Sequence, residues 1–227
     1  MPRLNPQELK LRLTYDYRVA KATKSDCFTI HAYRTQRDAL AGRREIVDSA
    51  DEHEAEHYMV LFSIKSMVAR GKYHDKFAAH FHLLAGGNYP YSAPSVNIHP
   101  AFWSPHCDSG GWVCANDDVW TQSRGKILFI HWVIHVAHLL NFHERDTHGP
   151  RYMGFNPDAI TYWRREMKCQ PITPGLVYAI LPTELTHGIE SASEMVFEPS
   201  AAEPVFEPAS EKPVFESVAS DNLFSAL

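Results

Sequence analysis

The sequence feature that most constrains the fold is an apolar run from Ile127 to Leu140. Apolar residues lie nearly all round this segment when it is drawn as a helix, with His131, His135 and His138 as the interruptions. The run is shorter than the roughly 18 consecutive apolar residues that indicate a membrane span. We therefore expect a helix that is buried against a sheet within a globular domain.

Four short segments ahead of this run have the composition and alternation of β-strands. Turn signals separate them, among them Arg70-Gly71-Lys72 and Gly86-Gly87-Asn88. Successive strands joined in this way predict an antiparallel meander of four strands. The predicted strands are Asp26–Arg34, Tyr58–Val68, Phe77–Leu84 and Ser95–Ile98.

The N-terminal region carries the signals of a helix start. Asn5 suits the cap position, Pro6 suits the first helical position, and Glu8 can reach back to the cap. The residues that follow also alternate with the period of a strand, and the cap decides in favour of a helix. Between the first two predicted strands, the charged stretch Thr35–His57 lacks strand periodicity, so we expect a helical or irregular connection there.

A second cap followed by proline occurs near the end of the folded part of the sequence. Asn156-Pro157-Asp158 predicts a helix that continues to about Lys168. Its inner face would consist of Ile160, Trp163 and Met167. Helices at both ends, an antiparallel meander and a buried helix together define an α+β fold class.

Composition restricts the function classes. Hydrophobic residues make up 44% of the 227 residues, which indicates a mostly globular chain, and the net charge of -5 gives no support for a nucleic-acid-binding face. The first residues lack the apolar core of a signal peptide, and four cysteines are too few to suggest a disulfide scaffold at this length. We expect a protein of the reducing cytoplasm with neither membrane nor nucleic acid as a partner.

The composition changes after Leu185, and a phenylalanine then recurs at intervals of nine residues. We divide the chain into a domain at 1–172, a linker at 173–190 and a disordered tail at 191–227. One interpretation of the tail is a solubilising segment that arose by duplication. The other is a multivalent ligand whose phenylalanines dock in pockets of a partner. The repeated residues are Phe197, Phe206, Phe215 and Phe224.

The strongest candidate for chemistry is Cys114, which lies in a loop just ahead of the apolar run. Free cysteines are usually buried structural residues, but Gly110-Gly111 before Cys114 and polar residues after it indicate a thiol that another chain can approach. His106, eight residues earlier, is either an ordinary loop histidine or a donor to an oxyanion. Asp146, which follows the apolar run, is either a solvated acid or a carboxylate that orients an incoming amine.

Two sets of residues contain possible metal ligands. His99, His106, Cys107 and Cys114 are possible zinc ligands, but they lack a tight C-x-x-C pair. His131, His135 and His138 share one helical face without the glutamate of an H-E-x-x-H motif. We therefore predict neither a metal nor another cofactor, and a small zinc hydrolase remains the weakest of the alternatives.

The central stretch resembles the ubiquitin-conjugating (E2) enzymes. Tyr89–Val96 is similar to the Y-P-F-x-x-P-x-V segment of that family, and Gly111–Cys114 is similar to the G-x-I-C segment that carries its catalytic cysteine. Trp120, the helix Ile127–Leu140 and Asp146 follow in the order in which the family has its tryptophan, its next helix and its acidic residue. The resemblance is close over about 60 residues.

Two features depart from the family pattern. The family's His-Pro-Asn stands here as Ser104-Pro105-His106, so His106 occupies the place of the oxyanion asparagine. Such a histidine occurs in bacterial E2-like proteins that are encoded beside E1-like and ubiquitin-like genes, and the resemblance points to that branch. The region Thr35–His57 is also longer than the usual hairpin of the family.

The resemblance implies a UBC-like fold and a cytoplasmic transferase without a cofactor. Cys114 would accept a ubiquitin-like protein from an E1-like enzyme as a thioester and pass it to a lysine of a target. His106 would donate to the oxyanion, and Asp146 would position the amine or accept its proton. A role in bacterial antiphage defence would follow from the same branch. The alternative is a catalytically inactive E2-like module that recruits partners through its tail.

Overall fold

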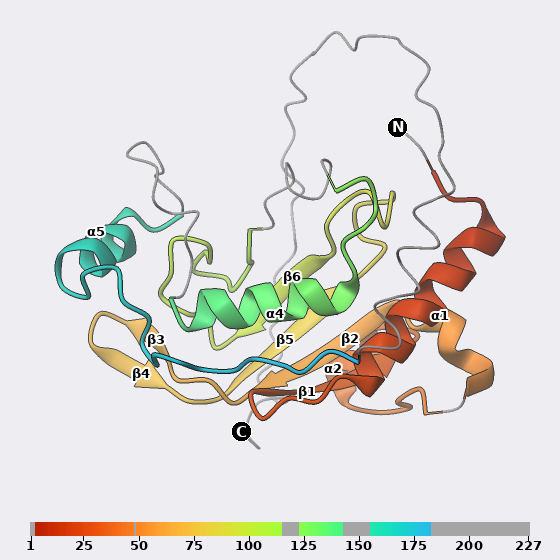
Figure 1. Cartoon of the computed structure of the whole chain (residues 1–227), viewed down its shortest axis with the longest axis horizontal. Helices are drawn as coiled ribbons and strands as arrows, with labels where there is room; N and C mark the ends of the chain where they lie inside the picture. Colours follow the sequence, from red (N-terminus) through yellow and green to blue (C-terminus); the bar gives the residue numbers. More distant parts are fainter. Residues whose placement is uncertain (1–2, 48, 115–122, 143–154, 183–227) are drawn as a thin grey trace, which may run out of the picture. The chain divides into compact units, whose positions relative to one another are not determined.

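The computed structural model describes residues 3–47, 49–114, 123–142 and 155–182, all within the unit Met1–Pro182. The fold is α+β, with an N-terminal helix and a four-stranded antiparallel sheet (Figure 1). None of the helices within these ranges has the length and apolarity needed to cross a membrane. The elements in chain order are α1 (Pro6–Ala22), β1 (Phe28–Tyr33), α2 (Gln36–Ala41), the 3-10 helix η1 (Ser49–Glu54), β2 (His57–Phe62), β3 (Ser66–Ala69), β4 (Lys72–His74), β5 (Phe77–His82), β6 (Ser95–His99), α4 (Phe129–Leu140) and α5 (Pro157–Arg165).

The main sheet has the order β1-β2-β5-β6, and every neighbouring pair is antiparallel. This confirms the predicted four-stranded antiparallel arrangement. The single strand predicted over Tyr58–Val68 is wrong, because β2 ends at Phe62 and the chain leaves the sheet to form a separate hairpin of β3 and β4. The break is hidden in the sequence because Ile64 and Met67, on its far side, are as deeply buried as the strand itself.

The two faces of the sheet differ in character, as the alternation of side chains requires. Tyr58 of β2 and Phe81 of β5 lie on the inner face, and their rings contact Phe129 of α4 at centroid distances of 4.1 and 5.4 Å. The opposite face carries His57 of β2 and His82 of β5, which lie directly across from each other. In Figure 1, α4 runs across the strands on the inner side.

α4 confirms the expectation of a buried helix. Its apolar residues fill the core between the sheet and α1. Burying such side chains contributes roughly 1.5–3 kcal/mol each before entropy is counted, so this helix dominates the packing. Its buried residues are Phe129, Ile130, Trp132, Val133, Val136, Ala137, Leu139 and Leu140.

α1 begins at the predicted cap, where Asn5 accepts from the amides of Gln7 and Glu8, and the Glu8 carboxylate accepts from the Asn5 amide. The charged stretch between β1 and β2 contains α2 and η1, as expected for a helical or irregular connection. α1 packs on α4, β1 and η1. The N-terminal helix is therefore a structural support of the core, not an appendage.

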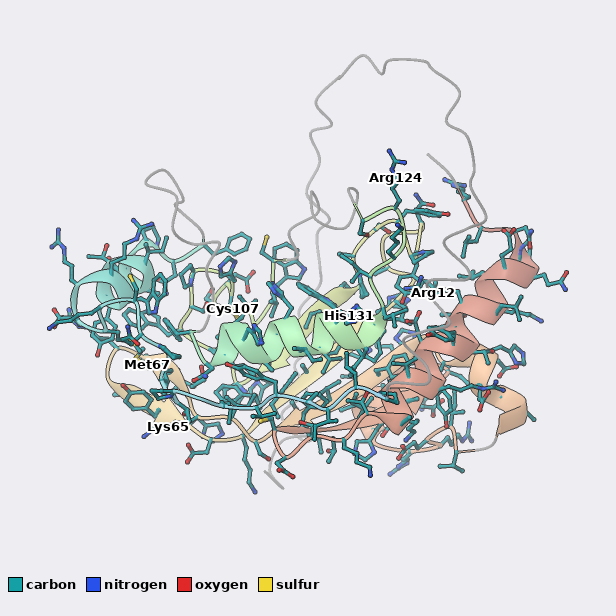
Figure 2. All side chains as sticks on the ribbon, in the orientation of Figure 1. Arg12, Lys65, Met67, Cys107, Arg124 and His131 are labelled. Atoms are coloured by element: carbon teal, nitrogen blue, oxygen red, sulfur yellow. The ribbon has the colours of Figure 1, made fainter. Side chains whose placement is uncertain are left out.

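A buried polar network joins α1 to the chain that enters α4. Asp16 is fully buried and accepts from Arg12 Nε (2.6 Å), the Tyr89 hydroxyl (2.5 Å) and the Phe129 amide (2.9 Å). Arg12 also donates to the carbonyls of Gly125 and Ile127. Figure 2 shows Arg12 near the N-terminal end of α4. Since the cap residue Leu128 has no side-chain acceptor, Asp16 supplies the anionic partner that a helix N-terminus favours.

α5 starts after its predicted cap, Asn156, which accepts from the Ala159 amide. Trp163 of α5 packs with Met67 of β3 and with Phe142, so the hairpin and the C-terminal helix share one apolar cluster. Beyond α5 the chain runs back along the domain, where Ile180 pairs with Lys24 in an antiparallel bridge. Part of the predicted linker is thus packed on the domain, whereas the predicted tail lies outside the described residues.

Candidate functional site

Cys114 ends a short extended segment that extends the pairing of the sheet beyond β6. The amide of Ile98 donates to the Gly111 carbonyl (2.8 Å), and the amide of Val113 donates to the Val96 carbonyl (3.0 Å). The next bond runs to the other side, from the Cys114 amide to the His106 carbonyl (2.8 Å). Main-chain hydrogen bonds on both sides therefore fix the backbone that carries the thiol.

Gly111 is the position at which this approach requires glycine. Its φ is +85°, and a Cβ built there would lie 2.2 Å from the carbonyl oxygen of Ile98. Real Cβ atoms never come that close to backbone, so a side chain at this position would push the segment off β6. Gly111 is therefore required for the backbone path that places Cys114 beside β6.

The turn between Cys107 and Val113 is organised by Asp108. One oxygen of its carboxylate accepts from the amides of Gly110 (2.9 Å) and Trp112 (2.8 Å), and its amide donates to the Trp112 carbonyl (3.0 Å). Aspartate often closes turns in this way, by hydrogen bonding to the backbone that follows it. Asp108 was not among the predicted site residues, although Asp-Ser-Gly-Gly is a turn signal in the sequence.

The loop that carries His106 is anchored at several points. The Ser104 hydroxyl accepts from the His106 amide (3.2 Å), the Trp103 amide donates to the Met67 carbonyl (2.6 Å), and the Phe155 amide donates to the Pro105 carbonyl (2.8 Å). These bonds connect the loop to β3 and to the approach to α5. His106 is half-buried. The structure therefore brings the backbones of His106 and Cys114 together.

The four cysteines differ in accessibility, which decides which of them suits nucleophilic chemistry. Cys27 and Cys107 are buried, Cys114 is half-buried, and Cys169 is exposed. Burial raises the pKa of the Cys107 thiol to about 12 and also raises the pKa of Cys27. Because the thiolate is the nucleophile, Cys107 is a poor candidate despite its position one residue after His106.

Two large aromatic residues are exposed beside this segment. Trp112 retains 40% and Phe155 49% of their accessible surface, and their rings meet edge to face with centroids 5.3 Å apart. Exposed aromatics of this kind are enriched where proteins contact one another. Cys114 thus lies two residues from an apolar surface that a partner can cover.

The other predicted site residues have different outcomes. Asp146 and Trp120 lie outside the described residues, so their roles stay predictions. Neither predicted set of zinc ligands forms a cluster within the described ranges. The group of three potential ligands found there consists of Glu56, His57 and His82, which the sequence analysis did not select.

Comparison with known proteins gives a limited result. No protein-family model and no curated protein matches the sequence. Among solved structures, that of human ubiquitin-conjugating enzyme E2 G1 is similar, with a TM-score of 0.39 and 18% sequence identity. The match covers 60% of this chain and 97% of that enzyme's chain. A likeness of this degree does not by itself assign the chain to a family.

Proposed function

We propose that the chain is an E2-like conjugating enzyme that carries a ubiquitin-like protein as a thioester on Cys114. The observation that carries the proposal is the placement of this thiol. It is half-buried, ends a segment hydrogen-bonded to the edge of the sheet, and is paired through its backbone with His106. The motif resemblance of Tyr89–Val96 and Gly111–Cys114 adds the E2-like chemistry.

The reaction has two acyl transfers. In the first, the Cys114 thiolate attacks the thioester carbonyl on an E1-like enzyme, and the E1 cysteine leaves as a thiolate. In the second, a lysine amine of the target attacks the Cys114 thioester, Cys114 leaves as a thiolate, and the amine loses a proton as the amide forms. Asp146 is proposed to position that amine or to accept its proton.

The role proposed for His106 is to stabilise the tetrahedral intermediate. Each attack places negative charge on the former carbonyl oxygen, and a nearby N–H donor lowers the energy of that oxyanion. The Cys114 amide donates to the His106 carbonyl, so the two residues lie on neighbouring stretches of backbone. The anchored loop limits the motion of His106, so little reorganisation is needed during the reaction.

A partner surface accompanies the thiol in this proposal. The exposed pair Trp112 and Phe155 offers an apolar contact beside Cys114 for the carried protein or the activating enzyme. Aromatic anchors supply much of the energy of such interfaces. The resemblance to the bacterial E2-like branch is the basis for proposing these partners and a role in antiphage defence.

The first test is a charging assay. The full chain is mixed with ATP and with the E1-like and ubiquitin-like proteins encoded beside its gene, and adducts are separated on a non-reducing gel. We expect a thiol-sensitive adduct for wild type and for the control Cys169→Ala, which removes an exposed cysteine outside the loop. Cys114→Ala should give none, and Cys114→Ser should give an oxyester adduct that resists thiols.

Other outcomes have defined meanings. An adduct that persists in Cys114→Ala would refute the proposed carrier. Absence of an adduct on wild type, with the E1-like protein shown to be charged, would favour the inactive binding module. Deletion of Met195–Leu227 would then be the next test, and loss of partner affinity would support recruitment by the tail.

The role of His106 has a separate test. His106→Ala should slow discharge of the charged enzyme to a lysine by about 10²–10³-fold, the usual cost of losing one oxyanion donor. Loading should be less affected. An equal loss in both steps would contradict the assignment of His106 to discharge.

A further inference from the structure

Three histidines gather on the face of the sheet opposite α4. His57 of β2 and His82 of β5 are direct cross-strand partners, and their rings stack at a centroid distance of 4.2 Å. His80, two residues before His82 and therefore on the same face, stacks on His57 at 5.3 Å, and its Nε2 lies 3.1 Å from His57 Nδ1. Glu56, just before β2, adds a carboxylate to the group.

His57 is buried, and His80 and His82 are half-buried. Burial first, and the neighbouring histidines second, lower the pKa of both His57 and His80 to about 4. Burial also lowers the pKa of His82. A neutral imidazole is the form that ligates a metal.

We propose that Glu56, His57 and His82 form a binding site for a divalent transition metal of the zinc class. One potential ligand atom from each residue lies within 4.8 Å of the other two. Tetrahedral zinc at about 2.0–2.1 Å from its ligands needs ligand atoms roughly 3.4 Å apart. The backbone pairing of His57 and His82 holds the two residues side by side, and contraction to that size requires their stacked rings to rotate.

His80 has a supporting role in this site. Its contact with His57 Nδ1 uses one nitrogen of His57 and leaves the other for the metal. Metal-bound histidines commonly use their second nitrogen in such a hydrogen bond, which fixes the tautomer and the ring orientation. His80 is therefore a positioning residue in the proposal, and Glu56, His57 and His82 are the ligands.

The chemistry of the ligands and the topology define what the site does. Two imidazoles and one carboxylate suit zinc, nickel or copper better than magnesium or calcium, which prefer oxygen ligands. The ligands join the start of β2 to the end of β5, the two central strands of the sheet. β6 separates them from the segment of Cys114, so the site is independent of the proposed acyl transfer.

The test is metal binding by the full, untagged chain after chelation and dialysis. Zn²⁺ is titrated by calorimetry against a competing chelator, and Co²⁺ is titrated by absorption spectroscopy. We expect one site in wild type, with the visible absorption of tetrahedral or five-coordinate Co²⁺ and without sulfur-to-cobalt charge transfer. His82→Gln should abolish that site. The control, His74→Gln, changes an exposed histidine on β4 and should leave binding unchanged.

The second variant distinguishes support from ligation. His80→Gln should weaken Zn²⁺ binding by about 10–100-fold, as expected for loss of a residue that orients a ligand. Circular dichroism establishes that each variant is folded, and His82 is the preferred target because it is only half-buried. Three results would overturn the proposal: no binding by wild type, binding that survives in folded His82→Gln, or a charge-transfer band that assigns the cobalt to a cysteine.

Discussion

Replacement of Asp16 should strongly destabilise the domain. Its carboxylate is fully buried and accepts three hydrogen bonds, from Arg12, Tyr89 and the Phe129 amide. Burial alone would lower the pKa of Arg12, but the charge of Asp16 raises it above its ordinary value, so the guanidinium stays charged. Removing Asp16 thus leaves a buried cation without its counter-charge.

The magnitude follows from that geometry. Hydrogen bonds to a charged group are worth about 1.5–3 kcal/mol each when measured singly, and three that share one carboxylate are not additive. Breaking a buried ion pair by removing one partner typically costs about 3–5 kcal/mol, and we expect a loss in that range for Asp16→Ala. With an m-value of about 2 kcal/mol/M in urea, the midpoint should fall by roughly 2 M.

The assay is urea unfolding followed by tryptophan fluorescence, carried out as a double-mutant cycle. Asp16→Ala gives the loss itself, and Asp16→Leu and Arg12→Met are measured singly and in combination, which replaces the pair by apolar side chains. The combination should recover much of the loss, because no unpaired charge remains. The exposed acid Asp26 provides the control, and Asp26→Ala should change stability by less than about 0.5 kcal/mol.

Two results would refute this reasoning. One is a loss below about 1 kcal/mol for Asp16→Ala, which would mean that water or a rearranged side chain satisfies Arg12. The other is a double variant whose loss equals the sum of the two single losses, since independent residues behave in that way.

Three further predictions follow from local geometry. Gly111→Ala should abolish charging of Cys114 while the domain remains folded, because a Cβ there meets backbone at 2.2 Å; normal charging in the gel assay would contradict this. In native protein at pH 8, iodoacetamide should modify Cys114 but not Cys107, whose pKa is about 12; labelling of Cys107 should rise about tenfold per pH unit, as measured by mass spectrometry. Although burial opposes it, the hydrogen bond from Lys21 helps lower the pKa of Glu45 below 4.5. This carboxylate therefore stabilises the fold above pH 4.5 and loses that effect as the pH falls through its folded-state pKa, so Glu45→Gln should reduce the acid sensitivity of urea unfolding by less than about 1 kcal/mol.

The elements that the sequence predicted well are those whose signals are local. The Asn5 cap, the Asn156 cap and the apolar run of α4 are local signals, and the three helices begin at or within two residues of the expected positions. α5 ends at Arg165, short of the predicted Lys168, so Met167 lies beyond the helix. The end of β2 was predicted wrongly because burial continues past Phe62 into Ile64. Composition alone does not distinguish a strand that continues from one that turns within the same core.

The candidate site was likewise predictable only where its signals are local. The loop position of Cys114 was readable from the glycines before it, but its pairing with His106 depends on hydrogen bonds that no local pattern encodes. The histidine group was missed for a related reason. His80 and His82 are spaced for one face of a strand, but His57 joins them only through the register of β2 with β5, which is set by distant contacts.

The segment of Cys114 also protects the sheet, and this links activity to solubility. β6 is the last strand of the sheet, and the amide of Ile98 and the carbonyl of Val96 would be open to another chain without the bonds from Gly111 and Val113. Unpaired edges of this kind promote association between chains. A change that detaches the segment therefore removes the thiol from its place and uncovers the edge at the same time. For this reason, loss of charging in Gly111→Ala should be accompanied by concentration-dependent association in light scattering, whereas Cys114→Ala should lose charging and stay monodisperse to the same degree as wild type.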